Sequence, residues 1–162
     1  MTKPLAVITG ASSGIGEATA KAFSNAGYPT LLLARRIEIM ESFNLKNSIC
    51  KKIDVRDRDA LVSAIREAEK QYGPTDMMFN NAGVARLADV STQDPSEWDE
   101  MIDVNTKGVM NGIYAVMKDM KARKSGTIVN MSSIAGRKVY GDHTVYCGCL
   151  LYTSPSPRDQ AK

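Results

Sequence analysis

An α/β fold with a doubly wound parallel sheet is indicated by three features of the amino-acid sequence. Short apolar runs alternate with helix-like runs along most of the chain. The runs at residues 5–9 and 30–34 lack polar alternation, which is typical of strands buried on both faces of a parallel sheet. A glycine-rich segment, residues 10–16, separates the first apolar run from the first helical run. Repeated strand–helix alternation implies right-handed crossovers, and therefore a doubly wound sheet with helices on both faces.

Five strands are expected in chain order. The third is less apolar than the others, which places it nearer an edge of the sheet. The expected strands are Leu5–Thr9, Thr30–Ala34, Ile49–Val55, Asp76–Asn80 and Gly126–Met131.

Helices are expected between these strands, because apolar residues recur there at helical spacing. Gly73 and Pro74 should end the third helix, and the positive charges of residues 121–124 suit the C-terminal end of the longest one. The expected helices are Gly14–Asn25, Glu38–Asn44, Asp57–Tyr72 and Pro95–Arg123.

Length and composition narrow the functional classes. The 162 residues suggest one domain, and the net charge of +3 is too small and dispersed to indicate a nucleic-acid partner. No apolar run approaches the ~20 residues of a membrane helix, and no leader is evident, so we expect a cytoplasmic protein. Cys50, Cys147 and Cys149 are expected as reduced thiols, without a metal. The one histidine, His143, gives a histidine-based catalytic triad little support.

The glycine-rich segment has the composition of a phosphate-binding loop. Glycines permit a tight turn and a close approach of the ligand, and the following helix offers its N-terminal N–H groups to phosphates. The alternative is a tight turn without a ligand; the strand before it and the helix after it favour a cofactor site. The predicted contacts are Gly10, Ser12, Ser13, Gly14, Ile15 and Gly16.

Charged residues lie at the ends of the second and third expected strands. Arg35 and Arg36 suit a ribose 2′-phosphate, whereas an acidic residue there would repel it, so NADP(H) is favoured over NAD(H). At the third strand, Asp54 offers a carboxylate to the adenine amino group, with Val55 beside it. The alternatives are a solvated helix start for the arginines and an ordinary surface aspartate.

Four motifs then occur in a fixed order, and together they resemble the short-chain dehydrogenase/reductase family over about residues 3–148. They are Thr9-Gly10-x-x-x-Gly14-Ile15-Gly16, Asn80-Asn81-Ala82-Gly83, Val104-Asn105-x-x-Gly108, and Ser133 thirteen positions before Tyr146. The resemblance is nearest to the bacterial NADP-dependent branch that acts on hydroxy acids and small alcohols. It implies the strand order 3-2-1-4-5 and subunits paired through the fifth and sixth helices, hence a homo-oligomer.

The resemblance also implies roles for single residues. Asn81, Ala82 and Gly83 would line the adenosine-ribose side and brace the central strands. Asn105 would hold a water at a kink in the long helix for a proton relay. Ser133 would hydrogen-bond the substrate oxygen, and Tyr146 would be the general acid in reduction and the general base in oxidation.

The sequence departs from the family pattern after Tyr146. The family has a lysine four residues later, which stabilises the tyrosine phenolate and holds the nicotinamide ribose; Leu150 stands there and can do neither. Residues 149–162 resemble a translated sequencing adapter, so we expect a partial Rossmann domain over 1–148 and a non-native or disordered tail over 149–162. The last strands of the family fold would be missing, leaving the fifth strand as an unpaired edge.

The expected function is NADP(H)-dependent interconversion of a small carbonyl compound and a secondary alcohol, impaired or absent in the chain as it stands. No metal, nucleic-acid or membrane partner is expected. A non-catalytic NADP-binding module is the main alternative. A methyltransferase with a similar core is disfavoured, because Asn81, Ser133 and Tyr146 would then have no role.

Overall fold

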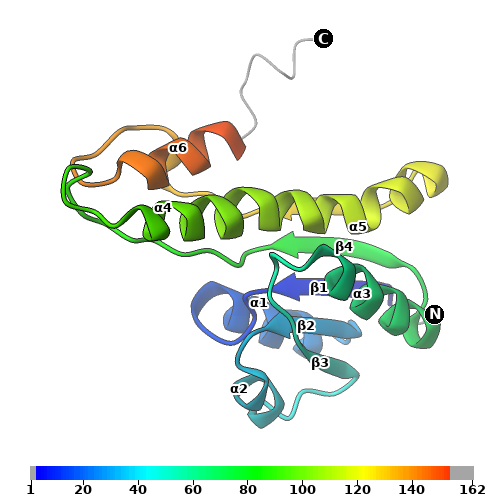
Figure 1. Ribbon diagram of the computed structural model, residues 1–162. Helices are drawn as coiled ribbons and strands as arrows, with labels where there is room; N and C mark the ends of the chain where they lie inside the picture. The colour runs from blue at the N-terminus through cyan, green and yellow to red at the C-terminus, as the bar shows by residue number, and fades with distance from the viewer. Residues whose placement is uncertain (1–2, 154–162) are drawn as a thin grey trace.

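The computed structural model describes residues 3–153, and its centre is a five-stranded sheet in the order β3-β2-β1-β4-β5 (Figure 1). All neighbouring strands pair in parallel. The predicted fold class and strand order are therefore confirmed. The strands are β1 (Leu5–Thr9), β2 (Thr30–Ala34), β3 (Ser48–Lys52), β4 (Thr75–Asn80) and β5 (Thr127–Asn130).

Helices cover both faces of the sheet. On each face, buried side chains of the sheet and of the helices form one hydrophobic cluster. One cluster joins β1 and β2 to α3 and α5, and the other joins the same strands to α1 and α2. Side chains alternate along β1, so Val7 enters the first cluster and Ile8 the second. The helices are α1 (Gly14–Asn25), α2 (Ile37–Ser42), α3 (Arg58–Tyr72), α4 (Pro95–Ile102), α5 (Gly108–Arg123) and α6 (Thr144–Thr153).

The helix expected from Pro95 to Arg123 is present over those residues. A π-helical turn, η1 (Asp103–Lys107), lies between α4 and α5, at the point where a kink beside Asn105 was expected. The turn leaves Asn105 buried and facing the segment after β4. In a regular helix the side chain at position 105 would point in a different direction. Helical periodicity in the sequence therefore did not predict where the Asn105 side chain faces.

Strand β3 ends at Lys52, three residues earlier than expected. The main chain still donates one bond from Ile53 to the Ala34 carbonyl. It then turns, because the Asp54 carboxylate accepts the N–H of Arg56. This side-chain-to-main-chain bond is a local alternative to sheet pairing, and it frees residues 53–55 to line the ligand edge of the sheet.

Helix α6 crosses the boundary that we predicted at residue 148. Cys149 and Leu150 are buried in it, and the helix continues to Thr153, within the segment that we predicted as a non-native or disordered tail. A short 3₁₀ turn, η2 (Ile134–Gly136), packs beneath the helix. Residues 154–162 lie outside the described residues. Among residues 3–153, the three cysteines form no disulfide and no helix is long and apolar enough to cross a membrane.

Candidate cofactor and active site

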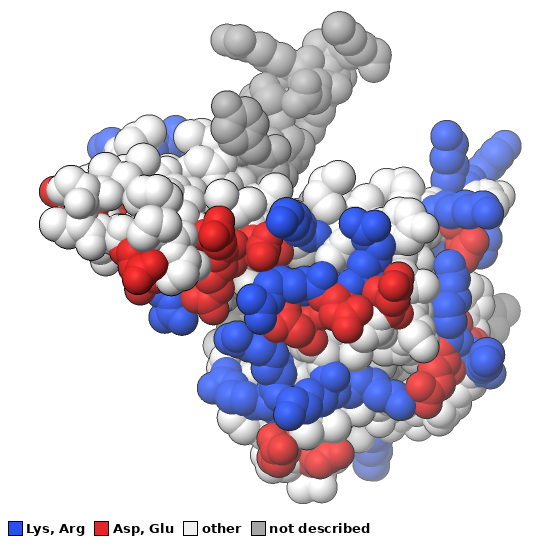
Figure 2. Space-filling view, viewed as in Figure 1, with Lys and Arg blue, Asp and Glu red and all other residues white. Residues whose placement is uncertain are grey.

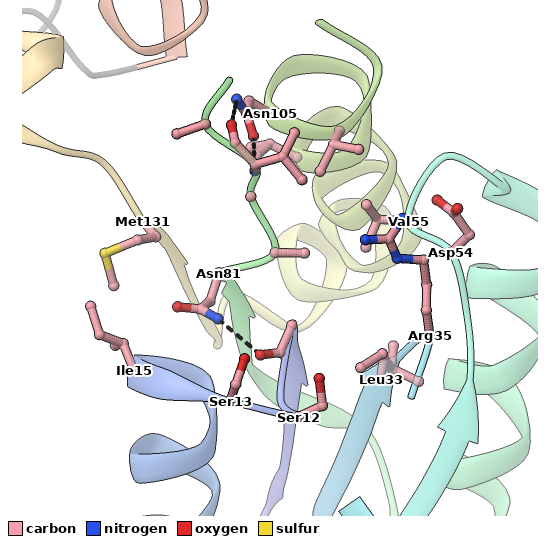
Figure 3. Close-up of a pocket in the computed structure, with 18 of the residues that line it drawn as sticks. Ser12, Ser13, Ile15, Leu33, Arg35, Asp54, Val55, Asn81, Asn105 and Met131 are labelled. Carbon is pink, nitrogen blue, oxygen red and sulfur yellow. Dashed lines mark hydrogen bonds between the residues drawn. The ribbon is translucent and has the colours of Figure 1, made fainter. Parts of the chain in front are cut away.

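A cavity of about 700 Å³ lies at the carboxyl ends of the strands, where β1 and β4 meet at the reversal of strand order. This position and volume are typical of ligand sites in parallel α/β sheets. Figure 3 shows side chains from several strand ends turned toward this space. The predicted site residues on its wall are Gly10, Ser12, Ser13, Ile15, Arg35, Arg36, Asp54, Val55, Asn81, Ala82, Gly83, Asn105, Ser133 and Tyr146.

Gly14 and Gly16 are absent from the wall, and their contribution is to the shape of the loop. Gly10 and Gly14 both have positive φ, of 64° and 57°. A Cβ on Gly16 would lie 2.3 Å from the Gly10 carbonyl oxygen, so only glycine permits this close return of the chain. Ser13 precedes α1 without capping it by its side chain, and the N-terminus of α1 faces the ligand edge.

A hydrogen-bonded brace joins the ends of β1 and β4. The Thr9 hydroxyl accepts the main-chain N–H groups of Asn81 and Ala82, at 3.0 and 3.1 Å. The Asn81 side chain donates to the carbonyl oxygens of Thr9 and Gly10, at 3.1 and 3.3 Å. The bracing role expected of Asn81 is therefore visible. Sequence reasoning gave Thr9 no role, although a hydroxyl that ends an apolar strand was the available signal.

The two adjacent arginines have different surroundings. The Arg36 guanidinium donates to the hydroxyls of Ser12 and Ser13, at 3.1 and 2.9 Å, so it lies against the glycine loop. The Arg35 guanidinium instead lies 3.9 Å from the Glu100 carboxylate of α4. A phosphate bound beside the loop would therefore meet Arg36 together with two hydroxyl groups.

Asp54 is bound closely by its own neighbour. The Arg56 guanidinium donates to both carboxylate oxygens, at 3.0 and 2.6 Å, and the Arg56 N–H donates to one of them, at 3.0 Å. The Arg56 side chain, followed by its main-chain bond, holds the pKa of the Asp54 carboxyl below its ordinary value. Arg56 was not predicted as a site residue. Figure 2 shows such positive and negative side chains interleaved over the viewed face.

Asn105 uses its whole side chain to hold the segment after β4. Its amide oxygen accepts the Val84 N–H at 2.8 Å, and its amide nitrogen donates to the Val84 carbonyl at 2.7 Å (Figure 3). Both side-chain polar atoms are thus engaged by protein. The water-holding role expected of Asn105 remains a prediction.

Ser133 and Tyr146 share the far wall of the cavity. The Ser133 hydroxyl accepts the Ala135 N–H at 3.3 Å and so begins η2. Tyr146 is half-buried against a small cluster that includes Leu150, and Leu150 itself lines the cavity. The His143 ring lies 6.3 Å from the Tyr146 ring, between centroids. The apolar Leu150 side chain therefore occupies the position where the resemblance implies a cation.

The cavity has the features that a dinucleotide requires. Its wall carries the glycine loop, Arg36 and Asp54, and it also carries the hydroxyl groups of Ser133 and Tyr146. Within residues 3–153, no group of three or more His, Cys, Asp or Glu side chains is placed to hold a metal ion. Fold and site together define a dinucleotide-binding α/β protein.

Comparison with known families shows to which family of dinucleotide-binding proteins the chain belongs. The model of the short chain dehydrogenase family matches residues 4–149, and the chain belongs to this family. An uncharacterized oxidoreductase of Staphylococcus saprophyticus is 42% identical over 146 residues, covering 88% of this chain and 59% of the relative. The acetoacetyl-CoA reductase of Paracoccus denitrificans is 38% identical over 136 residues, covering 83% and 56%.

Solved structures of oxidoreductases are also similar to this chain. The closed form of a serine dehydrogenase complexed with NADP⁺ has a TM-score of 0.87 at 28% identity, covering 91% of this chain and 61% of that one. A metagenomic short-chain oxidoreductase in complex with NADP has a TM-score of 0.83 at 31% identity, covering 91% and 70%. The chain spans about three fifths of the length of the curated relatives named above.

Proposed function

We propose that this protein is an NADP(H)-dependent oxidoreductase that interconverts a small carbonyl compound and a secondary alcohol. One observation carries the proposal: a single cavity is lined by the glycine loop at one end and by Ser133 and Tyr146 at the other. When bound, the nicotinamide cofactor supplies or accepts the hydride. The oxygen of the reduced carbonyl then needs a proton, and a phenol beside a second hydroxyl suits that task.

In this proposal Tyr146 transfers the proton and Ser133 positions the substrate oxygen. Ser133 lies at the start of η2, where its bond to Ala135 fixes its direction. Asn105 acts indirectly, because its hydrogen bonds hold Val84, a residue of the cavity wall, against the π turn. Asn81, Ala82 and Gly83 form the floor on which the ribose next to adenine would lie.

The preference for NADP(H) rests mainly on Arg36. Its guanidinium and the hydroxyls of Ser12 and Ser13 form one donor cluster beside the glycine loop, and such a cluster suits the 2′-phosphate. Asp54 would repel that phosphate if it lay alone there, but Arg56 neutralises it. Two of the solved relatives described above are complexed with NADP, which is consistent with this preference.

Leu150 supports the proposal that turnover in this chain is slow. It occupies the wall beside Tyr146 and offers neither a charge nor a donor. Loss of a tuned acid–base group commonly costs ~10²–10⁴ in rate. The same observation favours the second candidate, a protein that binds NADP(H) without turnover.

The proposal extends to pairing between copies of the chain through α5. Met110, Tyr114 and Met117 recur at helical spacing and are 60%, 66% and 45% exposed. Apolar side chains gathered on one helical stripe mark an interaction surface more often than scattered ones do. A second copy supplies the same stripe, as a two-fold interface requires.

The test combines binding with turnover. NADPH fluorescence titration of the unchanged chain should show saturable binding, and NADPH oxidation with a panel of small ketones and aldehydes should be faster in Leu150→Lys than in the unchanged chain. Tyr146→Phe in the Leu150→Lys background should bind NADPH equally and lose turnover. Binding with no turnover in either background would favour the non-catalytic alternative, and no binding at all would overturn the proposal.

A further inference from the structure

Asn111 lies outside the cavity wall, yet it is buried in α5 and bonded to the turn that carries Asp54. It is 3% exposed, and its side-chain nitrogen donates to the Val55 carbonyl oxygen at 2.9 Å and to the Arg56 carbonyl oxygen at 3.4 Å. A buried side-chain amide that donates hydrogen bonds to a loop holds that loop to the helix. None of the family motifs in the sequence includes this residue.

The peptide unit between Val55 and Arg56 is held from both sides. Its carbonyl oxygen accepts from Asn111, and its N–H donates to the Asp54 carboxylate at 3.0 Å. Because a peptide unit is planar and rigid, the direction of its carbonyl fixes the direction of its N–H. The Asn111 amide therefore sets the orientation of the Arg56 N–H, which donates to the Asp54 carboxylate.

The direction of the Asn111 amide is itself fixed. Its oxygen accepts from Arg58 Nε at 2.9 Å, which leaves the nitrogen to face the two carbonyl groups. The Arg58 guanidinium in turn lies over the Tyr114 ring, 5.4 Å from its centroid. Helix α5 also approaches the turn closely: a Cβ on Gly108 would lie 2.6 Å from a Val55 methyl carbon.

We propose that Asn111 is a positioning residue for recognition of the adenine base, acting through the Val55–Arg56 peptide unit on the Asp54 carboxylate. The inference rests on the proposed function, since it takes NADP(H) as the ligand. Figure 3 shows Asp54 and Val55 side by side on one side of the cavity, away from Met131. In that position the carboxylate is available to accept from the adenine amino group.

The experiment compares two nucleotides that differ only at the base. The probes are NADPH and its hypoxanthine analogue, in which oxygen replaces the adenine amino group. The unchanged chain should bind NADPH about tenfold more tightly, the range of a hydrogen bond to a charged group. Asn111→Leu should reduce that ratio to about two or less, because the peptide unit loses its fixed direction. A general loss of stability would weaken both nucleotides equally and leave the ratio unchanged.

Two further variants keep the inference falsifiable. Val116→Ala, which removes buried volume from the same helix away from the turn, should lower the melting temperature and keep the ratio. Arg58→Gln removes the bond that fixes the Asn111 amide, and should lower the ratio even if Asn111→Leu does not fold.

The outcomes separate the inference from the proposed function. An undiminished ratio in Asn111→Leu, or in Arg58→Gln where the first variant does not fold, overturns the role of Asn111 alone. Equal binding of both nucleotides by the unchanged chain overturns adenine recognition by Asp54, and with it the inference, while the cofactor assignment stands. Binding of neither nucleotide overturns the proposed function and the inference together.

Discussion

Neighbouring residues in this chain have different tasks because their side chains meet different partners. Arg36 lies on the hydroxyls of the glycine loop, whereas Arg35 reaches toward Glu100 of α4. Because both residues are arginine, the sequence did not indicate which of the two would contact a phosphate. Their contacts make Arg36 the residue that a 2′-phosphate would meet first.

We therefore expect Arg36→Leu to weaken NADPH binding about tenfold or more, the usual worth of a charge-assisted bond, and to leave NADH binding within about twofold. Arg35→Leu is the matched control, with the same change in charge one position away, and should have the smaller effect. Fluorescence titration with both nucleotides measures this. A larger loss in Arg35→Leu would contradict the assignment.

A second prediction at this scale concerns the pH dependence of stability. Arg56 holds the pKa of Asp54 below its unfolded-state value, which is about 4. The contribution of Asp54 to stability is thus fully present above that pH, and it is lost as the pH falls through the folded-state pKa. Urea midpoints of the unchanged chain and of Asp54→Asn should differ at pH 7 and converge on acidification. A difference that grows on acidification would refute this sign.

Elements position the site where the chain departs from regular structure. The π turn η1 brings the Asn105 amide against both main-chain groups of Val84. The early end of β3 similarly frees residues 53–55 to face the cavity. Irregular turns of this kind are common at functional sites, since they redirect a side chain that a regular element would point elsewhere.

Asn105→Ala should lower the free energy of unfolding by about 1–3 kcal/mol, because the part-buried N–H and carbonyl of Val84 would both lose their partner. Asn105→Asp keeps the acceptor for the Val84 N–H and loses the donor, so its effect should be smaller. Urea denaturation of the three chains measures this order. Equal stability of Asn105→Ala and the unchanged chain would show that water replaces the amide at no cost.

At the scale of the whole molecule, two of the apolar features on the described surface suit association between chains. The first is the α5 stripe of Met110, Tyr114 and Met117. The second is β5, which is an edge of the sheet and carries Val129 at 37% exposure. Edge strands and apolar stripes both promote association between chains.

We expect the chain to associate in solution through the α5 stripe, and Met117→Glu to lower its mean mass toward that of a monomer. At a two-fold interface the substitution is present in both copies, so two carboxylates are desolvated and they repel each other. Lys118→Gln changes the net charge by the same amount off the stripe and should leave the mass unchanged. Size-exclusion chromatography with light scattering is the measurement. Association undiminished by Met117→Glu would place the contact elsewhere, with the β5 edge as the next candidate.

Local pattern was sufficient for the fold. Unbroken apolar runs require burial on both faces, and helical periodicity requires one buried stripe, so the sheet and its helices followed from neighbouring residues. The glycine loop was equally evident, because positive φ at Gly10 and the contact at Gly16 admit little else. The order of the strands and the roles of Asn81, Asn105, Ser133 and Tyr146 came from the resemblance of four motifs to one family, whereas the loop contacts, the arginines and Asp54 were predicted from their own chemistry.

The remainder depended on contacts between residues far apart in the chain. The Thr9–Asn81 brace, the Asn105–Val84 pair and the bond from Asn111 to Val55 join residues 72, 21 and 56 positions apart. No periodicity records such a partner, because a hydrogen bond depends on the direction of one group toward another after the elements have packed. The chemistry of single residues was therefore readable in the sequence, while the orientation that makes them a site was set by packing of α5 and the strand ends.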